Sequence, residues 1–283
     1  MDYESTNNIS NKYDLVIEAG KSKSHYWKNI WRYHELFVFF AWRDILVRYK
    51  QTVFGISWSI VRPLLSMIVF SIIFGRIAKL PSDGIAYPVL VYAAMLPWTF
   101  FATSLMAISN SLIGNANLIS KIYFPRIIIP TSTIIVSLVD FLISFVIYII
   151  LMIIYKVQIS WHIVTLPLFL FLTILSVIGL GLLIAAMNVK YRDFKYIVPF
   201  IIQLGMYISP VGFSSNIIPE KWRLLYSINP MVGIIDGFRW ALLGGHVKIY
   251  LPGLLISIIL MVIFCITGIK YFRSTEQNFA DVI

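Results

Sequence analysis

The sequence predicts an all-α integral membrane protein, and three observations carry this prediction. Hydrophobic residues make up 59% of the 283-residue chain and charged residues only 13%, whereas about a quarter of the residues in a soluble domain are charged. The mean hydropathy is +0.83. Six apolar stretches are long enough, or nearly long enough, to cross a hydrocarbon core of ~30 Å as helices. We therefore expect one helical domain of six membrane spans.

The chain begins with a polar segment and an amphipathic one. Residues 1–25 are rich in Asn, Ser, Lys and acids, which predicts a disordered tail. Over residues 26–52 aromatic and charged residues alternate, and six aromatic or aliphatic residues recur at helical spacing: Trp27, Ile30, Trp31, His34, Phe37 and Val38. This pattern predicts an amphipathic helix that lies in the headgroup layer and leads into the first span. A helix packed on a soluble partner domain is the alternative interpretation.

The six-span domain is expected over residues 53–273, and its first half contains the two charges that lie well inside spans. The first span, residues 56–77, contains Arg62, which either snorkels to the interface or faces the protein interior. The second span covers residues 87–113. The third, residues 127–155, contains Asp140, which we interpret as a paired structural group or a pore-side group, because proton relays use several intramembrane acids.

The second half of the domain is less regular. The fourth span, residues 163–187, contains Gly179 and Gly181, which predict a close approach of two helices. The fifth span, residues 197–213, is short, and the sixth covers residues 250–271. Between them, residues 214–248 hold apolar pieces too short to span, which predict re-entrant or interfacial helices. A polar tail follows over residues 274–283.

The distribution of Lys and Arg predicts the orientation of the chain. With six spans, 15 of the 23 Lys and Arg residues fall on the side of the termini and seven on the other side. The remaining one, Arg62, lies inside the first span and is counted on neither side. Because basic residues stay on the cytoplasmic side, both termini and the connectors 114–126 and 188–195 are expected in the cytoplasm. The net charge of +10 is therefore interpreted as membrane anchoring, and no nucleic-acid partner is expected.

Motifs for chemistry are sparse. No GxxxxGK[ST] sequence is present, so the chain is not expected to bind ATP through a P-loop. The four histidines are scattered and there is one cysteine, Cys265, so no metal site is expected. No Ser lies in a GxSxG motif. We expect no catalytic residues, no cofactor in this chain and no enzymatic activity of its own.

Several stretches, in the same order along the chain, resemble the permease subunits of type-2 ABC exporters for polysaccharides and polyol phosphates, such as O-antigen, capsule and teichoic acid. The resemblance covers about residue 31 to the end. Its most specific part is RDILVRYKQTVFGISWSIVRPLL, at the approach to the first span. Further matches are LPWTFFATSL, NLISKIYFPRIIIP, NVKYRDF and the segment from SPVGFSSNIIP to GFRWALLG between spans five and six.

The resemblance implies partners and candidate sites. It implies a homodimer of this chain with two copies of a separate ATPase subunit that binds ATP and Mg, in a bacterial cytoplasmic (inner) membrane. Candidate ATPase-coupling contacts are Lys121, Tyr123, Arg126, Tyr191, Arg192 and Asp193. The segments between spans five and six would be outer gate helices, with candidates Trp222, Arg223, Asp236 and Arg239.

The implied substrate is a glycan linked to undecaprenyl diphosphate, and O-antigen is the glycan that we expect. The inner-rim residues Arg43, Arg48, Lys50 and Arg62 are candidate diphosphate contacts; the alternative interpretation is that they only enforce topology. Two other functions stay open at this point. One is a membrane-embedded enzyme of lipid-linked sugar metabolism, and the other is a type-2 ABC permease for a small molecule.

Overall fold

The computed structural model describes residues 26–50, 55–82, 84–191, 193–245, 247 and 249–279, apart from the side chains of residues 27–29, 55, 56 and 277. The predicted tail 1–25 and the last residues, 280–283, lie outside this range. Every regular element in the described part of the chain is a helix. The elements are α2 (Tyr26–Arg32), α3 (His34–Lys50), α4 (Gly55–Phe70), the π-helix η1 (Ser71–Ile77), α5 (Tyr87–Gly114), α6 (Ala116–Ile119), α7 (Ile128–Ile154), η2 (Trp161–Thr165), α8 (Leu166–Lys190), α9 (Phe194–Ile208), η3 (Ser215–Ile217), α10 (Glu220–Tyr226), α11 (Pro230–Leu242), α12 (Leu251–Thr275) and η4 (Glu276–Asn278).

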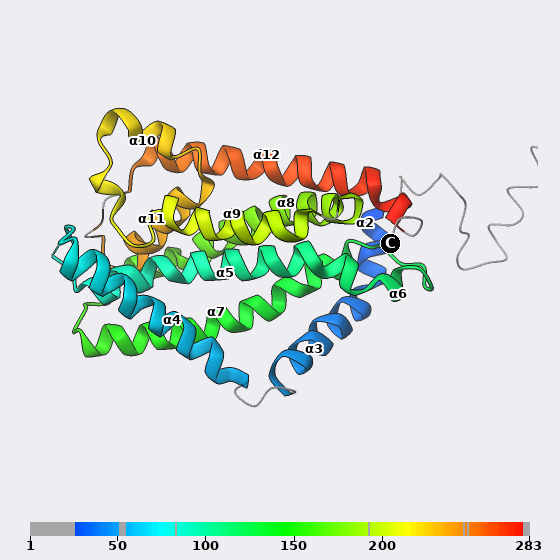
Figure 1. Cartoon of the computed structure of the whole chain (residues 1–283), viewed down its shortest axis with the longest axis horizontal. Coiled ribbons are helices and arrows are strands. Elements are labelled where there is room, and N and C mark those ends of the chain that lie inside the picture. Colours follow the sequence, from blue (N-terminus) through cyan, green and yellow to red (C-terminus); the bar gives the residue numbers. More distant parts are fainter. Residues whose placement is uncertain are drawn as a thin grey trace, which may run out of the picture.

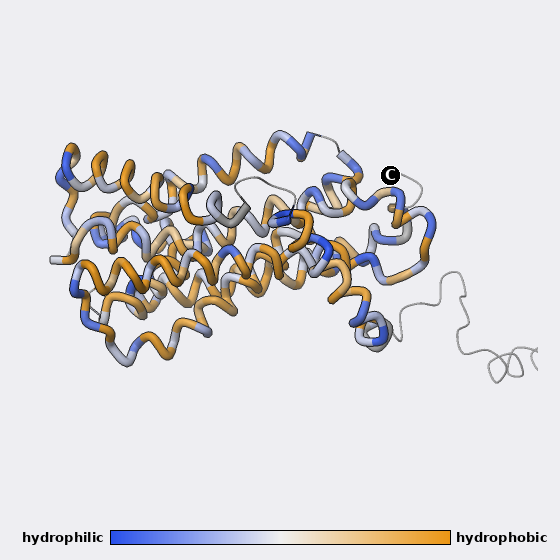
Figure 2. Tube along the Cα trace, turned by 90° about the horizontal axis from the view of Figure 1, so that it is seen from below, coloured by the Kyte–Doolittle hydropathy of each residue, from blue (hydrophilic) through white to orange (hydrophobic). Residues whose placement is uncertain are grey.

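The long helices form an elongated bundle with two different ends (Figure 1). α2, α6 and the C-terminal η4 lie at one end, which we call the terminal end, and α10 and α11 lie at the other, which we call the α11 end. Apolar residues run along the helices, while hydrophilic residues gather toward the two ends (Figure 2). This distribution is the one expected where lipid surrounds the middle of the bundle and water its ends.

α5 is the centre of the bundle, and α4 is at its margin. In the most apolar 18-residue stretch of each helix, 78% of the α5 residues are buried but only 6% of those in the α4–η1 span. α5 packs against α7, α8 and α11, whereas much of α4 faces outward. The exposed side chains of α4 are apolar, among them Val61, Leu65 and Ile68. A helix with such a surface is stable in lipid or against another apolar protein surface.

The predicted close helix approach at Gly179 and Gly181 is confirmed. A Cβ atom built on Gly179 would lie 2.6 Å from the backbone nitrogen of Cys265 in α12, and one built on Gly268 would collide with the carbonyl oxygen of Gly179. A Cβ on Gly181 would lie 2.8 Å from the Ile108 side chain in α5. Glycines therefore let the α8 and α12 backbones touch, as small residues do at helix crossings in membranes.

Among the residues that the structure describes, five helices are long and apolar enough to cross a membrane: Ser57–Ile77, Tyr87–Gly114, Ile128–Ile154, Trp161–Lys190 and Leu251–Thr275. The fifth predicted span is shorter than expected, because α9 has 15 residues and ends at Ile208 rather than at Phe213. Ser209 then adopts an extended conformation, with φ −78° and ψ 154°, as is usual for the residue before a proline, here Pro210. At 1.5 Å per residue α9 is about 22 Å long.

The predicted N-terminal amphipathic helix is two helices in the structure. The break is at Tyr33, whose N–H donates to the carbonyl of Ile30 at 3.1 Å, the spacing of a tight turn. α3 packs against α7 through the buried Phe40 and Ala41, whereas Trp31 is 81% exposed and Val38 and Phe39 also face outward. The bend lets α2 reach the C-terminal end of α12 while α3 follows α7. The last predicted residues of this segment, 51 and 52, lie outside the described residues.

Candidate functional site

A cavity of about 420 Å³ opens between α4, α5, α7 and α9, beside the end of α3. Its wall is mixed in character. Charged groups come from Arg48, Arg62 and Asp140, hydroxyl and amide groups from Ser59, Ser66, Thr99, Thr103, Ser137, Ser144 and Gln203, and aromatic rings from Trp58, Trp98, Phe100 and Phe141. A cavity of this composition can bind a ligand that is partly charged and partly apolar.

Asp140 of α7 contacts both the end of α3 and the start of α4. Its Oδ1 accepts hydrogen bonds from the Tyr49 hydroxyl and the Ser59 hydroxyl, both at 2.6 Å, and its Oδ2 forms an ion pair with Arg48. The Asp140 side chain is 13% exposed and that of Arg48 is 41% exposed. Asp140 is thus paired with Arg48 and also lines the cavity, and its predicted pore-side role stays a prediction.

The four inner-rim basic residues separate into two pairs. Arg48 and Arg62 both line the cavity, and the Arg62 guanidinium lies 5.4 Å from the centroid of the Trp58 ring. Arg43 instead donates to the neighbouring Asp44 at 2.8 and 2.9 Å, and does not line the cavity. Lys50 is exposed at the end of α3. Only the first pair is therefore placed to contact one ligand in this cavity.

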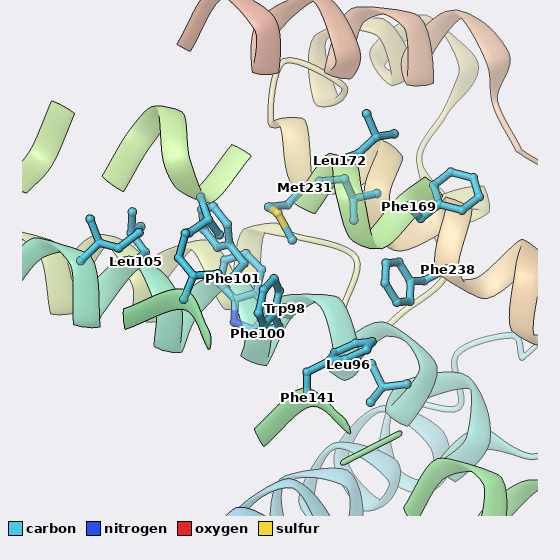
Figure 3. Packing of buried hydrophobic residues seen from close by; sticks show 14 of the residues in the cluster. Leu96, Trp98, Phe100, Phe101, Leu105, Phe141, Phe169, Leu172, Met231 and Phe238 are labelled. Carbon is cyan, nitrogen blue, oxygen red and sulfur yellow. The ribbon is translucent and has the colours of Figure 1, made fainter. Parts of the chain in front are cut away.

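Figure 3 shows Phe100, Phe141 and Phe238 among the packed aromatic side chains of the core, and the first two of these also line the cavity. Phe100 of α5 contacts Phe141 of α7 edge-to-face at 5.7 Å between ring centroids, and Phe141 contacts Phe238 of α11 at 6.1 Å. The Trp98 ring lies against Gly205 of α9, where an added Cβ atom would be 2.8 Å from its Cη2 atom. The cavity wall is thus connected by packed rings to α11, and α9 approaches it through a glycine.

The connector 114–126 presents a small surface at the terminal end. Ile119 and Phe124 are buried, whereas Lys121, Ile122 and Tyr123 are exposed. Exposed apolar side chains next to a lysine are suited to contact with another protein. The remaining predicted coupling residue of this connector, Arg126, points back into the protein: its guanidinium donates to the main-chain carbonyl of Glu276.

The second connector lies at the same end (Figure 1). Tyr191 and Asp193 are exposed, and Arg192 lies outside the described residues. Asn188, three residues before Tyr191, is buried and donates from Nδ2 to the carbonyl of Ser109 in α5 at 2.7 Å. This hydrogen bond anchors the first residue of the connector to α5, whereas Lys190, Tyr191 and Asp193 are exposed.

The predicted gate residues occupy different environments at the α11 end. Trp222 is exposed on α10, and Arg223 donates to the carbonyls of Ile218 at 3.0 Å and Asn216 at 3.2 Å. Asp236 and Arg239 of α11 are buried. The Arg239 guanidinium donates to three main-chain carbonyls, those of Leu90 at 3.2 Å, Val211 at 3.1 Å and Phe213 at 2.7 Å.

Sequence reasoning missed residues that act through long-range contacts. Tyr49 and Ser59 gave no signal because a lone hydroxyl near a span is common, and Glu276 was placed in a polar tail. Tyr26 was counted with the amphipathic segment, although its hydroxyl donates to Glu276 at 2.9 Å. A metal-binding cluster of three or more His, Cys, Asp or Glu residues is absent from the part of the chain that the structure describes.

Comparison with known proteins supplies the family context for this geometry. The family described as ABC-2 type transporter matches residues 35–243. The chain is 27% identical over 257 residues to the O-antigen export system permease protein RfbA of Klebsiella pneumoniae, covering 88% of this chain and 95% of that protein. It is 25% identical over 258 residues to the RfbA protein of Myxococcus xanthus, covering 90% of this chain and 98% of that protein.

A further relative has a different named substrate. The chain is 24% identical over 242 residues to the polysialic acid transport protein KpsM of Escherichia coli, covering 83% of this chain and 91% of that protein. All three relatives thus align along most of their own length. Because the family match covers well over half of the sequence, the chain belongs to the ABC-2 type transporter family.

Proposed function

We propose that this chain is the membrane-spanning subunit of an ATP-driven exporter that moves O-antigen polysaccharide, linked to undecaprenyl diphosphate, across the bacterial inner membrane. The observation that carries the proposal is the alignment, over nearly the full length of both proteins, with permeases named for O-antigen export. The resemblance noted in the motifs of the sequence leads to the same substrate class.

The composition of the cavity supports a lipid-linked glycan as the ligand. Arg48 and Arg62 offer guanidinium groups, which bind phosphate oxygens through paired hydrogen bonds. Trp58 and Trp98 offer flat faces on which sugar rings can pack, and hydroxyl groups of Thr99 and Thr103 are among those that complete the wall. A diphosphate with an apolar tail and a sugar head would find a partner for each of its parts here.

The contact between the two described ends of the chain supports the proposed topology. Tyr26 and Glu276 are hydrogen-bonded at the terminal end, so the chain crosses the bundle an even number of times between them. Within the described residues five helices are long enough to cross, and the shorter apolar helix α9 is the proposed sixth crossing. The excess of Lys and Arg on this side supports a cytoplasmic location of both termini.

The proposed energy source is a separate ATPase subunit, with ATP and Mg bound there and not in this chain. The exposed residues of the connectors 114–126 and 188–195 are its proposed docking surface, on two copies of this chain that form a homodimer. The outward apolar face of α4 supports the dimer, because a second copy would cover it. On this proposal the purified chain alone hydrolyses no ATP.

Export assays in a strain that lacks this chain test the proposal. We expect undecaprenyl-linked O-antigen to accumulate on the cytoplasmic side and to reach the surface when the chain and its ATPase are restored. Normal surface O-antigen in the strain that lacks the chain would contradict the proposal. So would turnover of a lipid-phosphate substrate by the purified chain without an ATPase, which the alternative of a membrane-embedded enzyme predicts.

Substitutions in the cavity test its role in substrate binding. Arg48→Met and Arg62→Met should each lower export about tenfold or more, because a hydrogen bond to a charged group contributes about 1.5–3 kcal/mol. Arg43→Met is the matched control, since Arg43 pairs with Asp44 outside the cavity and its loss should leave export unchanged. Equal effects of all three substitutions, per amount of assembled complex, would show that these residues serve topology alone.

A further inference from the structure

Three segments that are far apart in the sequence meet at the terminal end. Glu276, at the start of η4, accepts a hydrogen bond on Oε2 from the Tyr26 hydroxyl of α2 at 2.9 Å. Its Oε1 accepts one from the backbone N–H of Arg126 at 2.7 Å, and its own main-chain carbonyl accepts one from the Arg126 guanidinium. One residue thus joins the first described helix, the end of the 114–126 connector and the end of α12.

Packed aromatic side chains surround Glu276 at this junction. Tyr26 is buried, and the Arg273 guanidinium lies 4.4 Å from the centroid of its ring. Phe272 and Phe279, on either side of Glu276 in the chain, are buried and contact each other edge-to-face at 5.3 Å. Burial raises the pKa of the Glu276 carboxyl, while the hydrogen bonds from Arg126 and Tyr26 oppose that rise.

The junction lies directly beneath the exposed surface of the connector. The exposed residues Lys121–Tyr123 are separated from Arg126 by Phe124 and Pro125 only, and the buried Phe124 ring lies 6.0 Å from that of Phe40 in α3. A force applied to the exposed residues therefore reaches α7 through the chain, α3 through Phe124, and α12 and α2 through Glu276. Without Glu276 the last of these routes loses both side-chain hydrogen bonds.

We propose that Glu276 is a positioning residue for energy coupling, which holds the 114–126 connector so that movement of the connector also moves α12 and α2. The inference rests on the proposed function, in which an ATPase subunit contacts this connector. Glu276 touches neither ATP nor the glycan, so it acts only through Arg126 and Tyr26. Its loss should separate ATP hydrolysis from export rather than abolish both.

The test compares Glu276 variants in the complete complex with the ATPase subunit. Glu276→Ala should assemble and hydrolyse ATP as the wild type does, yet export roughly tenfold less glycan per complex, the factor expected when two hydrogen bonds of ordinary strength are lost. Glu276→Gln keeps the acceptor for the Arg126 N–H and should restore part of the export. Tyr26→Phe should give an intermediate loss, and Asn278→Ala, an exposed neighbour in η4, should give none.

Two results would overturn the inference. One is wild-type export by the Glu276→Ala complex, and the other is a proportionate fall of assembly, hydrolysis and export, which indicates a structural role alone. Measuring export by the wild-type complex in the same assay distinguishes failure of the proposed function from failure of the proposed role of Glu276. If the wild-type complex moves no lipid-linked glycan, the proposed function fails; if it does and the Ala variant does equally well, only the coupling role of Glu276 fails.

Discussion

At the α11 end a guanidinium is sealed inside protein, whereas at the terminal end the charged groups lie at a partly exposed junction of three chain segments. Arg239 is 0% exposed and donates to carbonyls from the start of α5 and from the turn after α9. Glu276 and Arg126 are only partly buried, and they join separate segments through two hydrogen bonds to each other and one from Tyr26 to Glu276. The two arrangements differ in how much free energy is lost when a side chain is removed.

The difference has a physical basis. A buried cation is costly unless all its donors are paired, and the carbonyls that it satisfies become costly in turn if it is removed. A partly exposed group can exchange a protein partner for water at little cost. The α11 end is therefore built as a fixed unit and the terminal end as one that can rearrange, which is consistent with the proposal that an ATPase subunit contacts the terminal end.

The largest expected effect comes from Arg239→Met. The substitution removes the side-chain donor to three main-chain carbonyls, two of them in fully buried hydrogen bonds, and it removes the Arg239 charge beside Asp236. We therefore expect the free energy of unfolding to fall by about 3 kcal/mol or more. Thermal unfolding of the purified chain in detergent measures it. Arg223→Met, at a more exposed site in the same region, is the control and should cost about 1 kcal/mol or less. Equal losses for both variants would remove the distinction between a sealed and an exposed arginine.

The next effect lies at the α8–α12 crossing, which connects the two ends. Gly268→Ala places a methyl group against the carbonyl oxygen of Gly179, where only backbone is available to move. Overpacking of this kind costs about 1–3 kcal/mol. Gly114→Ala is the matched control, because a Cβ atom there meets nothing within 4 Å. If Gly268→Ala had the same free energy of unfolding as the wild type, α8 and α12 would be able to separate easily. The terminal end and the α11 end would then be mechanically independent.

A smaller effect is expected from Asp140→Asn. The amide still accepts from Tyr49 and Ser59 but cannot balance the charge of Arg48, and the partial exposure of the pair limits the loss to about 1 kcal/mol. The comparison is Asp44→Asn, since the Arg43–Asp44 pair joins adjacent residues of one helix and fixes no other element. A double-mutant cycle with Arg48→Met measures the coupling. A coupling energy of zero would show that the Arg48–Asp140 ion pair does not hold the end of α3 against α7.

The sequence was informative about elements and much less so about contacts between them. The length of the apolar stretches predicted the five long helices, and Gly179 and Gly181 predicted a close approach of two helices. Both predictions were possible because stretch length and residue size can be read from a short piece of sequence. The shortened α9 follows from Pro210, whose effect on the preceding residue was visible but not used. The partners of Asp140 are 81 and 91 residues away, and those of Glu276 are 150 and 250 residues away. Pairings over such distances depend on the fold, which single residue types do not encode.

The smallest expected effect is a pH dependence at the terminal end. The charged and titratable groups that face Glu276 are Tyr26, Arg126 and Arg273, and burial raises the pKa of its carboxyl above the ordinary 4.5. The folded protein then holds this proton more tightly than the unfolded chain does, so the contribution of Glu276 to stability falls as the pH rises above 4.5. Glu276→Gln stays neutral and lacks this dependence.

The measurement is therefore the difference in Tm between wild type and Glu276→Gln as a function of pH. This difference should decrease as the pH rises above 4.5, because the stabilising contribution of the wild-type carboxyl falls while the amide of the variant does not titrate. Asn278→Ala, with no titratable group removed, should run parallel to the wild type. A difference that grows with pH would mean that the hydrogen bonds from Tyr26 and Arg126 outweigh burial. The terminal end would then be held by a stabilised carboxylate, and the contrast with the sealed Arg239 would be weaker.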